Sequence, residues 1–138
     1  MNRLEFKLIK HFRPEEITAT GARLNSVQFE LLLKYDEFRE AIGLPVFFVP
    51  NGLTTGDHKS PYHKAGLAGD CIIKGAINHQ TVFRTALGCG FKGIGFYWNG
   101  KLFSFHLDMG DDYRFWKGIK TGTQKTWAYN ELVRPPNE

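Results

Sequence analysis

The sequence predicts an α+β fold in which a small antiparallel sheet with one β-hairpin is flanked by two or three helices. Apolar residues recur at helical spacing over residues 26–42, and they alternate at strand spacing on both sides of an Asn-Gly pair at positions 99 and 100. The chain has 138 residues, of which 42% are hydrophobic, which suffices for an ordinary core. We therefore expect a single domain over residues 1–138.

Both ends of the chain are predicted to lie outside the core. Residues 1–24 are interpreted as an arm or short extended segment, because apolar residues alternate over residues 4–8 and Pro14 then ends the pattern. Residues 117–138 are expected to form a tail. Two apolar residues are the expected anchors of this tail: Trp127 and Leu132.

The longest predicted helix covers residues 26–42. Asn25 and Gln28 form a plausible capping pair at its start, and Gly43 followed by Pro45 ends it. Its apolar face follows steps of three and four residues: Val27, Leu31, Tyr35, Phe38 and Ile42.

Three shorter elements and one long loop follow this helix. Residues 45–49 and 70–73 are predicted as short strands, and residues 78–87 as a short helix that ends at a pair of glycines. Residues 50–69 are rich in Gly, Pro, Thr, Asp, His and Lys, which indicates a loop. A loop of this length is unusual in a compact domain unless it has a function.

The clearest local signal is the hairpin around residues 99–100. An Asn-Gly pair predicts a type I′ turn, because both central residues of that turn need a positive φ. A two-residue turn would place Gly95 opposite Ser104 and Gly93 opposite His106. We therefore expect open space beside His106, where the glycines have no side chain.

The second strand of this hairpin is predicted to have one packed face and one polar face. Side chains alternate between the two faces of a strand. The face toward the core would carry Phe103, Phe105, Leu107 and Met109. The opposite face would carry Leu102, Ser104, His106 and Asp108.

The composition argues against several classes of protein. Eighteen Lys and Arg against fourteen Asp and Glu leave a net charge of +4, but the charges are scattered, so we expect no nucleic-acid binding. The N-terminus has no signal-peptide pattern, and no segment has the ~18 apolar residues of a membrane span. We expect a monomer made in the cytoplasm, without membrane insertion. Cys71 and Cys89 are interpreted as inert thiols, with a single disulfide as the alternative.

Three residues of this chain have the chemistry of zinc ligands. His63 and Asp70 bracket a bend in the long loop, and His106 lies on the polar face of the hairpin. Catalytic zinc sites typically use three protein ligands from the types His, Asp, Glu and Cys, and keep a fourth position for water. We therefore predict that His63, Asp70 and His106 bind one Zn²⁺.

The same residues lie in a motif that resembles a known family. Residues 60–70, SPYHKAGLAGD, resemble the SxHxxGxAxD signature of the D-alanyl-D-alanine carboxypeptidase and L-alanyl-D-glutamate endopeptidase family, with one extra residue between Ser60 and His63. Phage endolysins and hedgehog-like domains are relatives of that family. Residues 90–97 and 105–110 also resemble one branch, with its GF-x-GIG-x-Y and F-x-H-x-D runs. The resemblance covers residues 26–116. It implies a hedgehog-like fold, zinc, and ligation by the two histidines and the aspartate.

The chain departs from this family at two positions. Many members have a Glu or Asp three residues before the last His, where it acts as general base; this chain has Phe103, which we expect to point into the core. Many members also have an Arg before the Ser, and Thr54 stands there in this chain. Asp108 is the candidate base, with the alternative that it orients His106.

Other polar and aromatic residues are weaker candidates for the site. Ser60 is expected to stabilise the loop rather than act as a nucleophile. The aromatic residues Tyr97, Trp98 and Trp116 either line a substrate groove or pack at the hairpin edge. Four unranked candidates could stabilise a carbonyl oxygen: His58, Lys59, Lys64 and His79. His11, His58 and His79 match no ligand spacing and are expected to be solvated.

These features favour a zinc metallopeptidase that uses metal-activated water. The family resemblance implies that its substrate is a D-amino-acid-containing peptide bond in peptidoglycan stem peptides, and therefore that it acts on the bacterial cell wall as a bacterial or phage product. The alternative is a catalytically impaired zinc-binding or cell-wall-binding module of the same fold, such as a virion-associated one. The absent Glu or Asp and the absent Arg support that alternative.

Overall fold

The structure is a computed structural model, and it describes residues 3–75, 78–120 and 128–132. Its first half contains α1 (Arg3–Phe6), α2 (Pro14–Thr18), the 3₁₀ helix η1 (Leu24–Ser26), α3 (Phe29–Ile42) and β1 (Val46–Phe48). Its second half contains β2 (Ala68–Ile73), α4 (His79–Gly88), β3 (Gly93–Trp98), β4 (Phe103–Asp108), β5 (Arg114–Ile119) and β6 (Ala128–Leu132).

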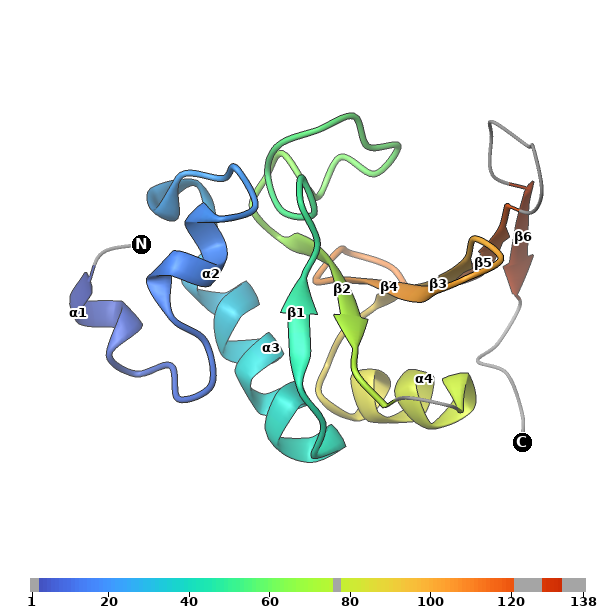
Figure 1. Cartoon of the computed structure of the whole chain (residues 1–138), viewed down its shortest axis with the longest axis horizontal. Helices are drawn as coiled ribbons and strands as arrows, with labels where there is room; N and C mark the ends of the chain where they lie inside the picture. Colours follow the sequence, from blue (N-terminus) through green and yellow to red (C-terminus); the bar gives the residue numbers. More distant parts are fainter. Residues whose placement is uncertain (1–2, 76–77, 121–127, 133–138) are drawn as a thin grey trace.

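The strands form one six-stranded sheet in the order β1-β2-β4-β3-β5-β6. Every neighbouring pair is antiparallel except β3 and β5, which run parallel. In Figure 1, α3 and α4 lie on one side of the strands, and the loop that joins β1 to β2 lies on the other side. The α+β class with a mostly antiparallel sheet is therefore confirmed.

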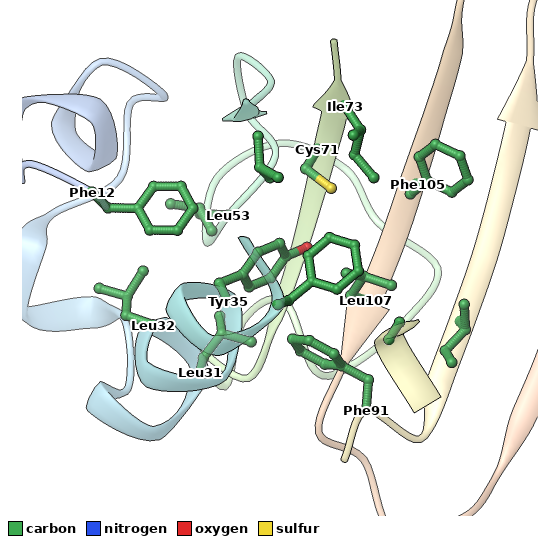
Figure 2. Packing of buried hydrophobic residues seen from close by; sticks show 14 of the residues in the cluster. Phe12, Leu31, Leu32, Tyr35, Leu53, Cys71, Ile73, Phe91, Phe105 and Leu107 are labelled. Carbon is green, nitrogen blue, oxygen red and sulfur yellow. The ribbon is translucent and has the colours of Figure 1, made fainter. Parts of the chain in front are cut away.

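The core lies between α3, α4 and the apolar face of the sheet. Tyr35 of α3 is buried at its centre, and its ring makes an edge contact with Phe91, with the centroids 5.2 Å apart. Figure 2 shows these rings beside Leu107 of β4. The Tyr35 hydroxyl donates a 2.6 Å hydrogen bond to the carbonyl of Gly69, so α3 is joined directly to β2. This contact fixes the position of β2 relative to α3.

The predicted N-terminal arm is wrong, because residues 3–24 contain two short helices, and several of their apolar side chains are buried in the core. Pro14 starts α2 instead of ending a segment, as its fixed φ suits the first turn of a helix. Leu8, which the alternation placed with the apolar residues, is exposed. The residues that are buried are Phe6, Ile9, Phe12, Ile17 and Ala22. Their spacing is not the alternation of a strand, and Ile9, Phe12 and Ala22 lie in the segments between the helices.

The longest helix, α3, starts at Phe29, later than the predicted residue 26, and lacks the expected capping pair. Asn25 lies in η1, and Gln28 is the N-cap residue of α3 but makes no side-chain cap hydrogen bond. Its end is as predicted, with Gly43 at a φ of 69°.

The hairpin has the predicted strands but not the predicted turn or register. Trp98 pairs with Phe103, so four residues connect the strands instead of two. The side-chain oxygen of Asn99 accepts hydrogen bonds from the backbone N–H groups of Lys101 and Leu102, and of the two central residues predicted, only Gly100 has a positive φ. The register is shifted by two residues, an even number, so each side chain keeps its predicted face.

The C-terminal segment also differs from a tail. β5 extends to Ile119, and β6 pairs with it over five residues, so residues 117–119 and 128–132 belong to the sheet. Leu132 packs against the core, as an anchor would. Trp127 and residues 133–138 lie outside the described residues.

Two further predictions concern cysteines and membranes. Cys71 and Cys89 are both free thiols, and burial raises the pKa of Cys71 to about 12, which makes it unreactive. Within the described ranges, the helices are too short or too polar to cross a bilayer.

Candidate metal centre

Three donor atoms from distant parts of the chain meet at one point above the sheet. His63 Nε2 lies 3.2 Å from His106 Nδ1 and 3.4 Å from Asp70 Oδ1. The third edge, from His106 Nδ1 to Asp70 Oδ1, is 3.1 Å. We call these three atoms the donor triangle.

The size of the donor triangle suits a small divalent ion. A tetrahedral zinc ion binds His nitrogen and carboxylate oxygen at about 2.0–2.2 Å, which separates any two donors by roughly 3.3 Å. The three observed edges bracket this value. A metal could therefore be bound with little movement of the side chains.

Each donor atom of the triangle comes from a different element. Asp70 and His106 are directly paired neighbours on β2 and β4, so their side chains leave the same face of the sheet. His63 comes from the long loop and is 1% exposed. Its Nδ1–H donates a 2.7 Å hydrogen bond to the carbonyl of Leu53, which leaves the lone pair of Nε2 directed into the triangle.

Asp108 orients His106 from the side of the imidazole that faces away from the donor triangle. Its Oδ2 accepts a 2.7 Å hydrogen bond from His106 Nε2, so that Nδ1 on the other side of the ring is free for the triangle. Its Oδ1 accepts hydrogen bonds from the backbone of Gly110 and from Arg114 Nη2, and the side chain is fully buried.

The prediction that Asp108 is the catalytic base must therefore be corrected. The imidazole of His106 stands between Asp108 and the donor triangle, and both carboxylate oxygens already accept hydrogen bonds. A water on a metal in the triangle is beyond its reach. The alternative of a positioning residue agrees with the geometry. The sequence analysis did not identify Arg114 as the partner of Asp108.

The glycines of β3 do not leave open space beside His106, contrary to the prediction. A Cβ at Gly93 would overlap the Asp108 carboxylate, and a Cβ at Gly95 would overlap the indole of Trp116. The Trp116 ring instead lies over Gly95, with its centroid 4.9 Å from that of His106. Both glycines are needed because the site fills this space with its own supporting side chains.

Buried charges of opposite sign hold the cluster together. Burial disfavours the imidazolium of His106, but the carboxylates of Asp108 and Asp70 outweigh it and raise its pKa to about 9. Burial also disfavours the Asp70 carboxylate, yet the hydrogen bond from His106 lowers its pKa well below the usual range. A metal ion must therefore displace a proton from His106 when it binds.

His58 belongs to this site, although the sequence analysis interpreted it as solvated. Its ring stacks on that of His63, with 3.6 Å between centroids, and its side chain is 17% exposed. Its Nδ1 lies 3.6 Å from Asp70 Oδ2. His58, His63 and Asp70 form a group that could hold a metal ion. His58 precedes the motif on a loop, so no spacing signal identified it.

The hydrogen bonds of His58 determine which of its nitrogens faces the site. Its Nε2 lies 2.8 Å from the carbonyl oxygens of both Asn51 and Thr55. Carbonyl oxygens only accept hydrogen bonds, so a neutral His58 has its proton on Nε2. Its Nδ1 then presents a lone pair toward Asp70. Asn51 adopts a φ of 58°, a conformation that asparagine tolerates better than most residues.

The remaining polar candidates from the sequence analysis do not all lie at this site. The hydroxyl of Ser60 accepts a hydrogen bond from the backbone of Tyr62, as expected of a loop-stabilising residue. Lys59 lines the site, whereas His79 stacks on Phe96 on the opposite face of the sheet. Lys64 is exposed. His11 forms an ion pair with Glu40.

Two departures from the family pattern can also be placed. The Thr54 hydroxyl hydrogen-bonds to that of Ser26, so it supports the loop. Phe103 was expected in the core but is 36% exposed, with its ring 4.5 Å from that of Trp98 at the end of the hairpin. It has no group that could act as a base.

The donor triangle opens into a groove of about 1160 Å³. The loop of residues 57–61 lines it above the metal ligands, and Tyr97 and Trp116 line it further along the sheet. Trp116 Nε1 donates a 2.8 Å hydrogen bond to the Tyr97 hydroxyl, so these two aromatic residues belong to the groove, as one of the two sequence interpretations held. Trp98 is not among the lining residues.

Comparisons with known proteins do not identify the chain: no family model, no curated protein and no solved structure matches it. The resemblance to zinc peptidases therefore depends on the motif residues and on the geometry described above.

Proposed function

We propose that this protein is a zinc-dependent peptidase that cleaves a D-amino-acid-containing peptide bond in peptidoglycan stem peptides. The observation that supports this most directly is the donor triangle of His63, Asp70 and His106, with edges of 3.1–3.4 Å. The groove beside it supports a substrate that is longer than one residue. The choice of peptidoglycan comes from the resemblance of residues 60–70 and 90–110 to the peptidase family.

The proposed ligand set agrees with the chemistry of zinc. Two imidazole nitrogens and one carboxylate oxygen leave a fourth tetrahedral position for water. Bound zinc would lower the pKa of this water and polarise the peptide carbonyl.

His58 is the residue of this chain that we assign to proton transfer. It takes the role that Asp108 cannot fill. Its Nδ1 faces Asp70 at the site, and its Nε2–H is held by two backbone carbonyls, which keeps the ring in this orientation. An imidazole in this arrangement can take up a proton at Nδ1 and later donate it to the leaving amine.

The side chains around the ligands would keep the site in this geometry. Asp108 and the Leu53 carbonyl orient the two histidines, and Trp116 covers one side of His106. Arg114 holds Asp108 and lies over the ring of Tyr62, with 4.8 Å from its guanidinium to the ring centroid. These contacts provide the preorganisation that a metal-assisted hydrolysis needs.

Metal content and turnover test this proposal together. Protein prepared without chelator should contain one zinc per chain, and His63→Ala, which lacks one of the three donors, should lose it. Purified sacculi should release muropeptides with the zinc-loaded wild type and not with His63→Ala. His79→Ala is the matched control, because His79 lies on the other face of the sheet and should leave both measurements unchanged. A wild type that binds no zinc would overturn the proposal.

The second candidate is a zinc-binding module without peptidase activity. The two departures from the family pattern, at Phe103 and Thr54, favour it. Zinc bound by the wild type without muropeptide release, over sacculi of several bacterial types, would support this module. His58→Ala separates the two candidates further: it should abolish turnover by a peptidase but leave wall binding by a module intact.

A further inference from the structure

One row of side chains crosses the whole sheet from the metal ligands to the last strand. Asp70 pairs with His106, His106 with Gly95, Gly95 with Trp116, and Trp116 with Glu131. Directly paired residues point to the same face of a sheet. All members of this row except Gly95, which has no side chain, line the same groove. Glu131 of β6 is therefore the far end of a surface that starts at the donor triangle.

The groove has opposite charges at its two ends. At the metal end, the guanidinium of Arg114 is already paired with Asp108 at 2.6 Å, so the positive charge that would attract a ligand there is that of the proposed metal ion. At the far end, the exposed side chain of Glu131 places a carboxylate on the groove. A ligand that crosses the groove would therefore be oriented, with its electron-rich group toward the metal end and a cationic group toward β6.

The indole of Trp116 covers the middle of the row between these ends. Gly95 allows the indole of Trp116 to lie across the row beside His106, since a side chain at position 95 would overlap it. The hydrogen bond from Trp116 to Tyr97 fixes the indole in this position. Within the row itself β3 contributes no side chain, and Tyr97 of the same strand lies beside the indole.

The length of the row sets the length of the ligand. Three strand spacings separate His106 from Glu131, which amounts to about 14 Å. An extended peptide advances about 3.3–3.6 Å per residue, so about four residues span this distance.

We propose that Glu131 binds a primary ammonium group of the substrate, about four residues from the group that the metal binds. The ammonium is either a free N-terminal amine or the amine of a basic side chain. This inference rests on the proposed metal site and deepens the proposed function, because it names a charged group that the substrate must carry.

Peptide hydroxamates test this subsite without requiring turnover. A hydroxamate chelates zinc, so it anchors one end of the probe at the donor triangle whether or not the protein is a peptidase. Six tetrapeptide hydroxamates suffice. One pair has a free or acetylated N-terminal amine, and two pairs with an acetylated N-terminus have a lysine or acetyl-lysine at the fourth or at the second residue from the hydroxamate. Isothermal titration calorimetry on the zinc-loaded protein measures their affinities at low salt.

We expect acetylation to weaken binding to the wild type by about two- to fivefold in one of these pairs, as is typical of an exposed ion pair. The pair that responds identifies the source of the amine. Glu131→Gln should remove this preference, and Glu30→Gln, an exposed change on α3, should keep it. The preference should also shrink at 0.5 M salt.

Two results would overturn the subsite. Acetylation could have the same effect in the wild type and in Glu131→Gln, or a lysine two residues from the hydroxamate could be preferred as strongly as one at four. Failure of the subsite is distinguishable from failure of the proposed function. Hydroxamates that bind without preference contradict the role of Glu131 alone, whereas hydroxamates that do not bind contradict the metal site on which both proposals depend.

Discussion

The two faces of β4 allow a direct comparison, because they alternate along the same six residues. Phe105 and Leu107 point to the helices, where each contacts other apolar side chains and no hydrogen bond directs its position. His106 and Asp108 point the other way and are equally buried, but each polar atom has a defined partner. Packing volume determines the side-chain positions on the apolar face, and the directions of hydrogen bonds determine them on the polar face.

This difference teaches where each kind of substitution should act. A buried apolar side chain contributes to stability through area and packing, so its loss reduces the stability of the whole domain. A buried polar side chain in a network contributes to the geometry of one site. Substitutions on the two faces should therefore separate stability from metal affinity.

Leu107→Ala tests the apolar face and should have the largest effect of this series. The side chain is fully buried beside Phe91 and Tyr35, so its truncation leaves a cavity and should lower the free energy of unfolding by about 2–5 kcal/mol. Urea denaturation measures this change. At a temperature where the variant is folded, its zinc affinity should equal that of the wild type. A large loss of zinc affinity in the folded variant would show that the two faces are coupled.

Asp108→Asn tests the polar face and should have a smaller effect. The amide keeps the size of the side chain, but it lacks the charge that orients His106 and binds Arg114. Loss of such an outer partner typically lowers metal affinity about 10- to 100-fold. Competition with a chromogenic chelator measures the affinity. Asp112→Asn is the control, because its side chain is exposed and Arg114 Nε donates to the backbone carbonyl of Asp112 rather than to its carboxylate.

The pH dependence of zinc binding should show a change of about tenfold per pH unit. His106 must lose a proton before Nδ1 can bind zinc, and its pKa is raised to about 9. Zinc affinity should therefore rise with pH up to about 9. Chelator competition at pH 6, 7 and 8 checks this slope, and an affinity independent of pH over this range would contradict the assignment of His106 as a ligand.

The metal-free protein should show the opposite trend. A pKa that is higher in the folded state than the ordinary His value of about 6.5 means that protonation stabilises the fold. This contribution is complete below about pH 6.5 and is lost as the pH rises through about 9. Thermal unfolding in chelator should therefore give a lower melting temperature at pH 9 than at pH 6.5, whereas His106→Gln should lack this difference.

The sequence was most informative where function depends on local spacing. The Asn-Gly pair and the alternation after it located the hairpin and placed His106 and Asp108 on one face. That assignment survived a register error of two residues, because side chains return to the same face every second residue. The motif spacing from His63 to Asp70 likewise identified two residues whose donor atoms lie 3.4 Å apart.

The sequence was misleading where the answer depended on packing against distant residues. Residues 3–18 looked like an arm because the contacts that bury them, such as those of Phe12 with Tyr35 of α3 and Phe48 of β1, leave no local pattern in the sequence. Glycines at positions 93 and 95 looked like open space because the side chains that fill it come from Asp108 and from Trp116 on β5.

Strand and helix periodicity, turn residues and residue types suited to metal binding are properties of short stretches of chain. The sequence alone therefore determined an α+β chain with a hairpin and three residues suited to zinc. Only the tertiary structure decided that His58 joins them, that Asp108 supports a ligand, and that Glu131 closes the row. The physical reason is that these relations join segments far apart in the chain, and their proximity results from the packing of the whole sheet and its helices.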